Sequence, residues 1–177
     1  GGEHVLLKDF ERLLNFFTKE GFNNIRVNSS GIKYSNELAK ALKDNNASLV
    51  ISPDSGTKEM YERIKRVKAF DTVWKNIGNY SKKSNLSKNL KIKYIIIPGV
   101  NSSHLEIDNF FNQVLKYNVR SVALSVEQEW YHSFYPNFPD SIFDLIKYFT
   151  EKPKSLNLDI EIYCEAESLL KTKDKDT

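Results

Sequence analysis

Strand signals and helix signals alternate along this chain, with about one strand and one helix in every 30 residues. The clearest unit spans residues 48–65, where a short apolar strand ends at a Ser-Pro-Asp-Ser-Gly break and an amphipathic helix follows. The strongest strand signal is residues 90–97, whose near-continuous apolar end is typical of a parallel strand covered on both faces. Because parallel strands are joined by long crossovers, usually helices, the alternation predicts an α/β fold with a parallel sheet, open or curved.

The other predicted elements follow the same alternation. We expect helices over residues 7–20, 35–44, 57–65, 70–80, 103–115 and 140–150, and strands over residues 24–28, 49–51, 90–97, 119–126 and 158–163. Thr57 is the expected N-cap of the third helix, and Ser102 or Ser103 starts the fifth. Residues 81–89 form a polar, Lys- and Asn-rich connection, which is the least structured part of the interior of the chain.

The composition limits the classes of function. Lys and Arg total 26 against 23 Asp and Glu, with both signs interspersed, so we expect no nucleic-acid partner. No apolar run approaches the roughly 18 residues of a membrane span, and no signal peptide is recognisable, so we expect a soluble, cytoplasmic protein. The single cysteine, Cys164, is expected to be an ordinary buried residue, and it cannot alone hold zinc or an iron–sulfur cluster. We expect one domain over residues 1–170 and a disordered polar tail over residues 171–177.

Polar residues stand between the strand of residues 49–51 and the helix that follows it. They are Ser52, Asp54 and Ser55. In parallel α/β proteins, ligands bind where the strands end and the helices begin, so these side chains are candidates for a binding edge. The same residue types also form turns and helix caps, and the sequence leaves both roles open.

Five short motifs occur in an order that resembles a known family. GGE opens the chain, NIRVNSSG follows, SPDSGTKEMYERIK and FDTVWKNIGNY come next, and KIKYIIIPGVN closes the series. Together they look like a radical S-adenosylmethionine (SAM) enzyme core from its second strand onward. The resemblance implies a partial (β/α)6 TIM-like barrel whose first βα unit is absent. It also implies an enzyme in which a 4Fe-4S cluster cleaves SAM reductively, so that a 5′-deoxyadenosyl radical abstracts hydrogen from the substrate.

The resemblance assigns cofactor-binding roles to the start of the chain. Gly1, Gly2 and Glu3 match the GGE motif, whose backbone and carboxylate receive the amino group of SAM. A tag-cleavage scar would also leave Gly-Gly, so the residues themselves keep that alternative open. His4 stands where the family usually has proline, a departure that changes the stiffness of the loop more than its chemistry.

The other cofactor-binding positions that the resemblance implies lie at or after strand ends, except for Lys65, which lies at the end of a helix. They are Asn28, Ser29, Ser52, Asp54, Lys65, Pro98, Gly99, Asn101 and Glu127. Ser52 and Asp54 would approach the ribose and the methionine carboxylate, and Lys65 would pair with that carboxylate as a point charge. Pro98 and Gly99, with Ile97, would lie beside the adenine. Ser125 ends the sixth strand of the family together with Glu127, and both also fit a plain strand end.

One departure from the family pattern concerns the cluster. The cysteines of the CxxxCxxC motif belong upstream of GGE in the family, and the sequence contains neither them nor the strand before them. We therefore expect a fragment of a longer enzyme, inactive by itself, whose 4Fe-4S cluster is held only by the full-length parent. A missing βα unit would expose one edge of the sheet, and an exposed edge predicts self-association.

The substrate and the catalytic residues are not evident from the sequence. The aromatic segment of residues 127–139 could line the mouth of a barrel and stack on a ring or a peptide, or it could simply cover the barrel end. Two other classes stay open. A cluster-free lyase would use Lys65 or Lys93 as a Schiff base, or Asp54 and Glu127 as acid and base. A noncatalytic domain would bind a partner through residues 130–138.

Overall fold

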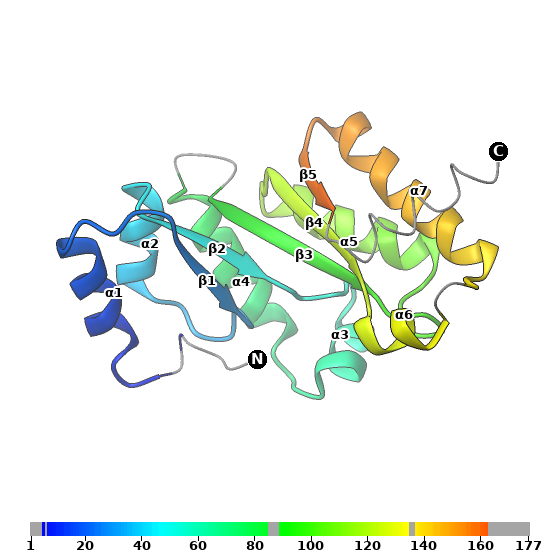
Figure 1. Cartoon of the computed structure of the whole chain (residues 1–177), viewed down its shortest axis with the longest axis horizontal. Helices are drawn as coiled ribbons and strands as arrows, with labels where there is room; N and C mark the ends of the chain where they lie inside the picture. Colours follow the sequence, from blue (N-terminus) through cyan, green and yellow to red (C-terminus); the bar gives the residue numbers. More distant parts are fainter. Residues whose placement is uncertain (1–4, 6, 85–88, 135–136, 163–177) are drawn as a thin grey trace.

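The structure, a computed structural model, describes residue 5 and residues 7–84, 89–134 and 137–162 (Figure 1). Five parallel strands form one sheet in the order β1-β2-β3-β4-β5. The strands are β1 Ile25–Ser29, β2 Ala47–Ile51, β3 Leu90–Ile96, β4 Ser121–Val126 and β5 Asp159–Ile162. Because the spatial order follows the chain order, every crossover advances the sheet in the same direction, as in a barrel. The predicted α/β fold with a parallel sheet, consistent with a partial TIM-like barrel, is confirmed.

The helices occupy nearly the positions that the hydrophobic periodicity predicts. They are α1 Phe10–Lys19, α2 Asn36–Lys43, α3 Lys58–Lys65, α4 Phe70–Ser81, α5 His104–Lys116, α6 Gln128–Phe134 and α7 Asp140–Leu156. Thr57 caps α3 by accepting from the amide of Met60, and Ser103 caps α5 by accepting from the amide of Glu106. Helix α7 is longer than predicted, because it continues past Pro153 until Asn157, which takes a left-handed conformation at φ 54°.

The strand β3 corrects one prediction. Its burial alternates, with Leu90, Ile92, Tyr94 and Ile96 buried and the residues between them only half-buried. The ring of Tyr94 contacts those of Phe110 in α5 and Phe149 in α7, so the buried residues of β3 face the helices. The prediction that β3 is covered on both faces is wrong, because its other face lacks an equivalent cover of helices among the described residues.

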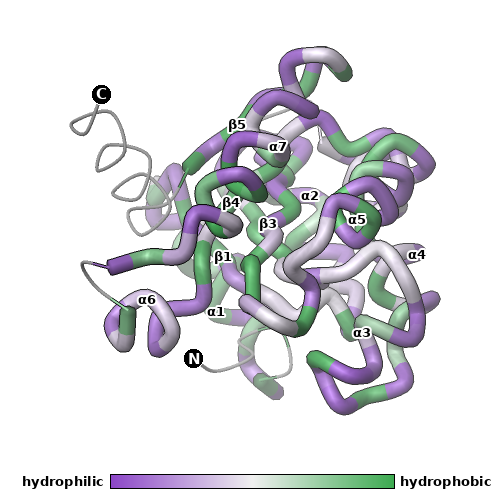
Figure 2. Tube along the Cα trace, turned by 90° about the vertical axis from the view of Figure 1, so that its right-hand side faces the viewer, coloured by the Kyte–Doolittle hydropathy of each residue, from purple (hydrophilic) through white to green (hydrophobic). Residues whose placement is uncertain are grey.

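Polar and charged residues occupy that other face, called here the open face. Strand alternation and the register place on it Arg26, Asn28, Ser48, Lys91, Lys93, Ser121, Ser125, Asp159 and Glu161. The ammonium of Lys91 forms an ion pair with the carboxylate of Glu161, across the small residues of β4. Figure 2 shows α3, α4 and α5 on one side of the sheet and α6 on the other.

Some predictions concern residues outside those that the structure describes. They are the roles of Gly1, Gly2, Glu3 and His4, the burial of Cys164, and the disorder of residues 171–177. Among the described residues, no helix has both the length and the apolar character that crossing a bilayer requires.

Candidate functional site

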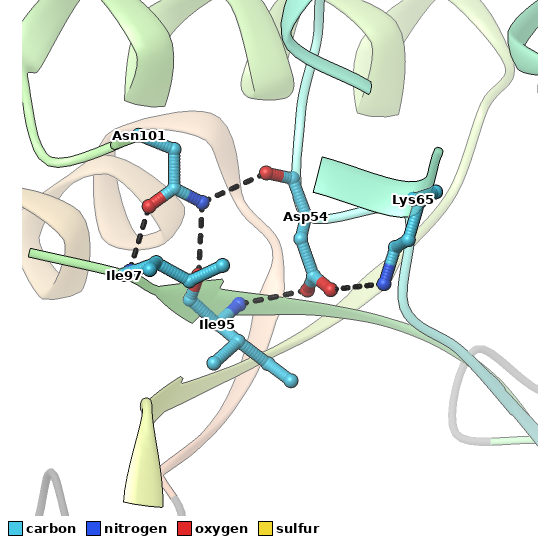
Figure 3. A network of polar contacts seen from close by, with 5 residues as sticks. All are labelled: Asp54, Lys65, Ile95, Ile97 and Asn101. Atoms are coloured by element: carbon cyan, nitrogen blue, oxygen red, sulfur yellow. Dashed lines mark hydrogen bonds and ion pairs between the residues drawn. The ribbon is translucent and has the colours of Figure 1, made fainter. Parts of the chain in front are cut away.

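The loop that follows β2 is tied to β3 by the side chain of Asp54 (Figure 3). One carboxylate oxygen of Asp54 accepts a hydrogen bond from the amide of Ile95 at 2.9 Å, and the other lies 2.5 Å from Nζ of Lys65, the last residue of α3. The pairing of β2 with β3 ends at Ile51 and Ile92. Asp54 therefore gives β3 a hydrogen-bond acceptor where the neighbouring strand no longer does.

Asn101 completes this connection, here called the Asp54–Asn101 network. Its amide nitrogen donates to the carbonyls of Asp54 and Ile95, both at 2.9 Å, and its side-chain oxygen accepts from the amide of Ile97 at 2.7 Å. Its own carbonyl accepts from the hydroxyl of Tyr94 at 2.7 Å. The side chain of Asn101 is fully buried, and all its polar groups are satisfied by backbone.

Burial controls the electrostatics of the network. Asp54 is only 2% exposed, and its desolvation raises the pKa of the carboxyl, while the nearby ammonium of Lys65 lowers it. Burial also raises the pKa of the Tyr94 hydroxyl, with smaller contributions from Glu106 and Asp54. Tyr94 therefore stays protonated at neutral pH and remains a donor to Asn101. The backbone of Asp54 has a φ of 56°, a left-handed conformation that the network fixes.

The rest of the loop is held against α5. A Cβ atom at Gly56 would lie 1.9 Å from the backbone carbon of Asn109, so only glycine allows this approach. The hydroxyl of Ser55 donates to the carbonyl of Thr57 at 2.9 Å and accepts from its amide at 3.0 Å. Ser55 thus closes the turn before α3 and is committed to a local structural contact.

Three of the predicted site residues lie at the carboxyl ends of β1 and β2, called here the rim. Asn28 is exposed, and Ser29 and Ser52 are half-buried. The register pairs Asn28 with Val50 and Ser29 with Ile51, which places all three residues at the carboxyl edge of the sheet. The hydroxyl of Ser29 also accepts from the amide of Gly31 at 3.0 Å, so it helps to shape the loop after β1.

The turn after β3 presents backbone groups at the same edge. Gly99 is exposed, has a φ of 76° and donates its amide to the hydroxyl of Ser102 at 2.8 Å. Pro98, before it, is half-buried. The positive φ at Gly99 explains why glycine stands at this position, because other residues rarely adopt this conformation.

Glu127 acts as the cap of a helix that the sequence interpretation missed. Its amide donates to the carbonyl of Ile96 at 2.9 Å, which joins the chain after β4 to the end of β3. Its carboxylate accepts from the amides of Glu129 and Trp130 at the start of α6. Ser125 is buried, and its hydroxyl donates to the carbonyl of Val126 at 3.3 Å.

Comparisons with known proteins identify the family. The model of the radical SAM superfamily matches residues 1–111, which contain GGE, the β2 loop and the β3 turn. This chain belongs to the radical SAM superfamily. No curated protein sequence matches it.

Solved structures show the same fold. Streptococcus suis SuiB bound to S-adenosylmethionine matches with a TM-score of 0.71 at 12% identity, over 96% of this chain and 38% of SuiB. SuiB bound to the precursor peptide SuiA matches with a TM-score of 0.69 at 13% identity, over 96% of this chain and 38% of that chain. A domain of pyruvate-formate lyase-activating enzyme from Bacteroides vulgatus matches with a TM-score of 0.64 at 16% identity, over 92% and 95% of the two chains. This chain thus spans well under half of SuiB.

The residues present do not fit the 4Fe-4S cluster that the radical SAM family implies. Such a cluster is held by cysteine thiolates, and the sequence has a single cysteine. Within the described ranges, no group of three or more His, Cys, Asp or Glu side chains is arranged to hold a metal ion. A cluster would need ligands from outside these 177 residues.

The charged residues on the open face of the sheet were also not predicted from the sequence. Burial lowers the pKa of the Lys91 ammonium, and the nearby Arg26 lowers it further. Lys93 lies two residues further along the same face, close enough for its charge to lower the pKa of Asp54 slightly. The alternation of lysine and apolar residues in Lys91-Ile92-Lys93 could have predicted this charged face. The apolar residues at the end of the strand outweighed it in the sequence analysis.

A second feature lies beside β1, away from the strand ends. A cavity of about 590 Å³ opens between α1 and β1, lined mainly by apolar side chains, among them Leu13, Phe16, Phe17, Ile25 and Val27. It is called here the α1–β1 groove. Asp9, Arg12 and Arg26 also line it, and it lies away from the carboxyl edge of the sheet, where Asn28, Ser29 and Ser52 are.

Proposed function

We propose that this chain supplies the SAM-binding part of a radical SAM enzyme, and that the parent protein holds the 4Fe-4S cluster through cysteines outside these residues. The observation that carries the proposal is the family match over residues 1–111. The structure supports it, because loops from three neighbouring strands meet at one edge of a parallel sheet. With the cluster bound, SAM would provide the radical that abstracts hydrogen from a substrate.

The proposed SAM contacts fall on residues whose polar groups lie on the rim. Asn28, Ser29 and Ser52 would hydrogen-bond the ribose and the methionine part, and the backbone at Pro98 and Gly99 would lie along the adenine. Their exposed or half-buried positions support these roles. Gly1, Gly2 and Glu3 would receive the amino group.

The remaining four predicted residues would position the site rather than contact SAM. Asp54, Lys65 and Asn101 direct their polar groups to one another and to the backbone of β3. Glu127 directs its carboxylate to the start of α6. Binding SAM through these groups would require breaking buried hydrogen bonds, each worth about 1 kcal/mol net.

Calorimetric titration of the 177-residue chain with SAM tests the proposal. We expect Asn28→Ala and Ser52→Ala each to weaken binding about fivefold, since each removes one hydrogen bond. Ser155→Ala is the matched control, because that hydroxyl on α7 bonds only to the carbonyl of Lys152 within the described residues. Equal affinities for all four proteins would contradict the assigned contacts, and an absence of SAM binding would contradict the proposal itself.

Anaerobic reconstitution with iron and sulfide tests the source of the cluster. Because one cysteine cannot supply three thiolates, we expect no stoichiometric 4Fe-4S absorption spectrum from this chain. A stoichiometric spectrum would show that the chain holds the cluster by itself.

For the substrate class we propose a peptide. SuiB, with the same fold, has been solved bound to its precursor peptide. In this chain, helix α6 follows β4 on the side of the sheet that α3, α4 and α5 leave free (Figure 2), and it carries the aromatic residues Trp130, Tyr131 and Phe134. Aromatic rings give a peptide large contact areas with little loss of conformational entropy.

A further inference from the structure

Aromatic side chains of α6 form a cluster with Phe138 and Phe143. The ring of Trp130 lies 4.9 Å from that of Phe134 and 5.8 Å from that of Phe138, and the rings of Tyr131 and Phe138 are stacked at 5.2 Å. Phe143, at the start of α7, meets Phe138 edge to face. No residue of α6 is fully buried, and Phe134 is 43% exposed. The cluster therefore lies at the surface, where Phe134 is exposed while Trp130, Tyr131, Phe138 and Phe143 are half-buried against the core.

The charge around this cluster differs from that of the rest of the chain. Lys and Arg number 26 among 177 residues, but none occurs in residues 121–146, which contain four acidic residues. Glu129 and Asp144 among them are exposed, and neither forms an ion pair with any described residue. Glu129 adjoins Trp130 and Asp144 adjoins Phe143 in the sequence, so exposed acidic residues accompany the aromatic surface in a protein whose net charge is positive.

We propose that this aromatic–acidic surface, formed by Glu129, Trp130, Phe134, Phe138 and Asp144, binds a lysine- or arginine-containing segment of a peptide. Aromatic faces attract ammonium and guanidinium groups, and carboxylates pair with them. The absence of Lys and Arg from residues 121–146, where His132 is the only residue of basic type, provides the charge complementarity. A nucleic acid would be repelled by the same charges.

The position of the surface connects it to the proposed SAM site. Glu127, the residue before α6, donates its amide to the carbonyl of Ile96 at the end of β3. Figure 1 shows the ends of β3 and β4 directed toward the side of the molecule where α6 lies. The inference rests on the proposed function only in regarding the peptide as a substrate, because peptide binding itself needs neither SAM nor a cluster.

Tryptophan fluorescence provides the test. Trp74 is fully buried and Trp130 is half-buried at the surface, so a ligand on α6 changes the emission of Trp130. The probe is a capped octapeptide with four lysines and two phenylalanines, and its control is the same peptide with every lysine acetylated. We expect the lysine peptide to bind at least tenfold more tightly at low salt, and this advantage to shrink as salt is added. Trp130→Phe should abolish the signal.

Two variants locate the binding. Glu129→Gln combined with Asp144→Asn should weaken binding of the lysine peptide at least fivefold, while leaving the fold intact because both side chains are exposed. Glu20→Gln, an exposed acid at the end of α1, is the matched control and should not change the affinity. Equal loss in the two proteins, or equal affinity for the acetylated peptide, would overturn the proposal.

Two further measurements separate the alternatives. Phosphatidylcholine vesicles that change the Trp130 emission more than the peptide does would show that the surface binds lipid, and would overturn the proposal. A SAM titration of the same samples distinguishes the two hypotheses. Protein that binds SAM but not the peptide overturns only this inference, whereas protein that binds the peptide but not SAM overturns only the proposed function.

Discussion

The Asp54–Asn101 network joins the loop after β2 to β3, whereas the α1–β1 groove lies between α1 and β1. The two regions differ in whether their side chains find contacts within the chain. In the network, buried polar atoms meet partners within the chain at 2.5–2.9 Å. In the groove, Leu13 and Phe16 are 50% and 55% exposed, although they line an apolar cavity. Among the described residues, the network is satisfied by contacts within the chain, whereas the groove keeps exposed apolar side chains.

The difference separates a region that this chain can build by itself from a region that another chain or segment could cover. Helix α1 is attached on one side, where the hydroxyl of Ser35 donates to the carboxylate of Glu11 at 2.9 Å. Its other side borders the groove and β1, which is an edge strand of the described sheet. Apolar surface beside a sheet edge favours association with another chain or segment. The network should thus form in this chain alone, whereas the described residues leave apolar surface uncovered at the groove.

The largest effect should come from filling the space at Gly56. Gly56→Ala places a methyl group 1.9 Å from the backbone of Asn109, so the β2 loop or α5 must move. We expect a loss of at least about 3 kcal/mol in the free energy of unfolding, or a protein that does not fold. Urea unfolding followed by circular dichroism measures this loss.

Gly99→Ala is the matched control for Gly56→Ala. A Cβ at Gly99 has no atom within 4 Å, so the substitution costs only the left-handed backbone conformation, about 1 kcal/mol. If the two variants lost equal stability, close packing of the β2 loop on α5 would not be what holds the site.

The next effect concerns the ion pair of the network. Lys65→Met leaves the buried carboxylate of Asp54 without its cation, and Asp54→Asn leaves the ammonium of Lys65 without its anion; we expect each to cost about 3 kcal/mol. The double variant should lose about 1–3 kcal/mol less than the sum of the two single losses, because the groups interact directly. Additive losses in urea unfolding would mean that the pair contributes nothing to the network.

The sequence predicted the parts of the fold that depend on local periodicity and capping. Thr57 was recognised as a cap and Ser102 or Ser103 as the start of α5, because Ser and Thr accept hydrogen bonds from the first turn of a helix; the structure makes Ser103 the cap. The five strands and six of the helices followed from spacing. Helix α6 was missed because it has only seven residues, so Trp130, Tyr131 and Phe134 fill one short face that does not repeat over further turns.

The roles of the site residues were less predictable, because they depend on contacts between distant parts of the chain. Asp54 and Asn101 were recognised as strand-end polar residues, but their bond spans 47 positions of sequence. No local pattern distinguishes a ligand-binding carboxylate from one that replaces a strand partner. The open face of β3 was misjudged because four apolar residues at its end outweighed the alternation of Lys91 and Lys93.

A smaller effect is expected at the α1–β1 groove. We predict that the chain self-associates through the α1–β1 groove, and that Leu13→Lys with Phe16→Lys shifts it toward monomer. Because both side chains are about half-exposed, the double variant should lose only about 1 kcal/mol of stability. Sedimentation velocity over a range of concentrations measures the shift. Leu105→Lys, which changes a 68% exposed leucine on α5, is the control and should leave association unchanged. A wild-type chain that stays monomeric at every concentration would contradict the prediction.

The smallest effect concerns an ion pair that is less buried than that of Asp54. Lys152 in α7 lies 2.7 Å from Asp108 in α5, and its hydrogen bond lowers the pKa of that carboxyl, helped by Tyr148. An acid whose folded pKa is lowered stabilises the protein above its unfolded pKa of about 4, and that contribution is lost as the pH falls through the folded pKa. Asp108→Asn should thus cost about 0.5–1 kcal/mol at pH 7, because the pair is partly exposed and screened, and almost nothing near pH 2. Urea unfolding of both proteins at several pH values measures the difference, and other titrating groups cancel because they are present in both. A cost that stays constant down to pH 2 would show that Asp108 acts through packing and not through its charge. The difference in stability between this pair and the Asp54–Asn101 network could then not be attributed to the burial of charge.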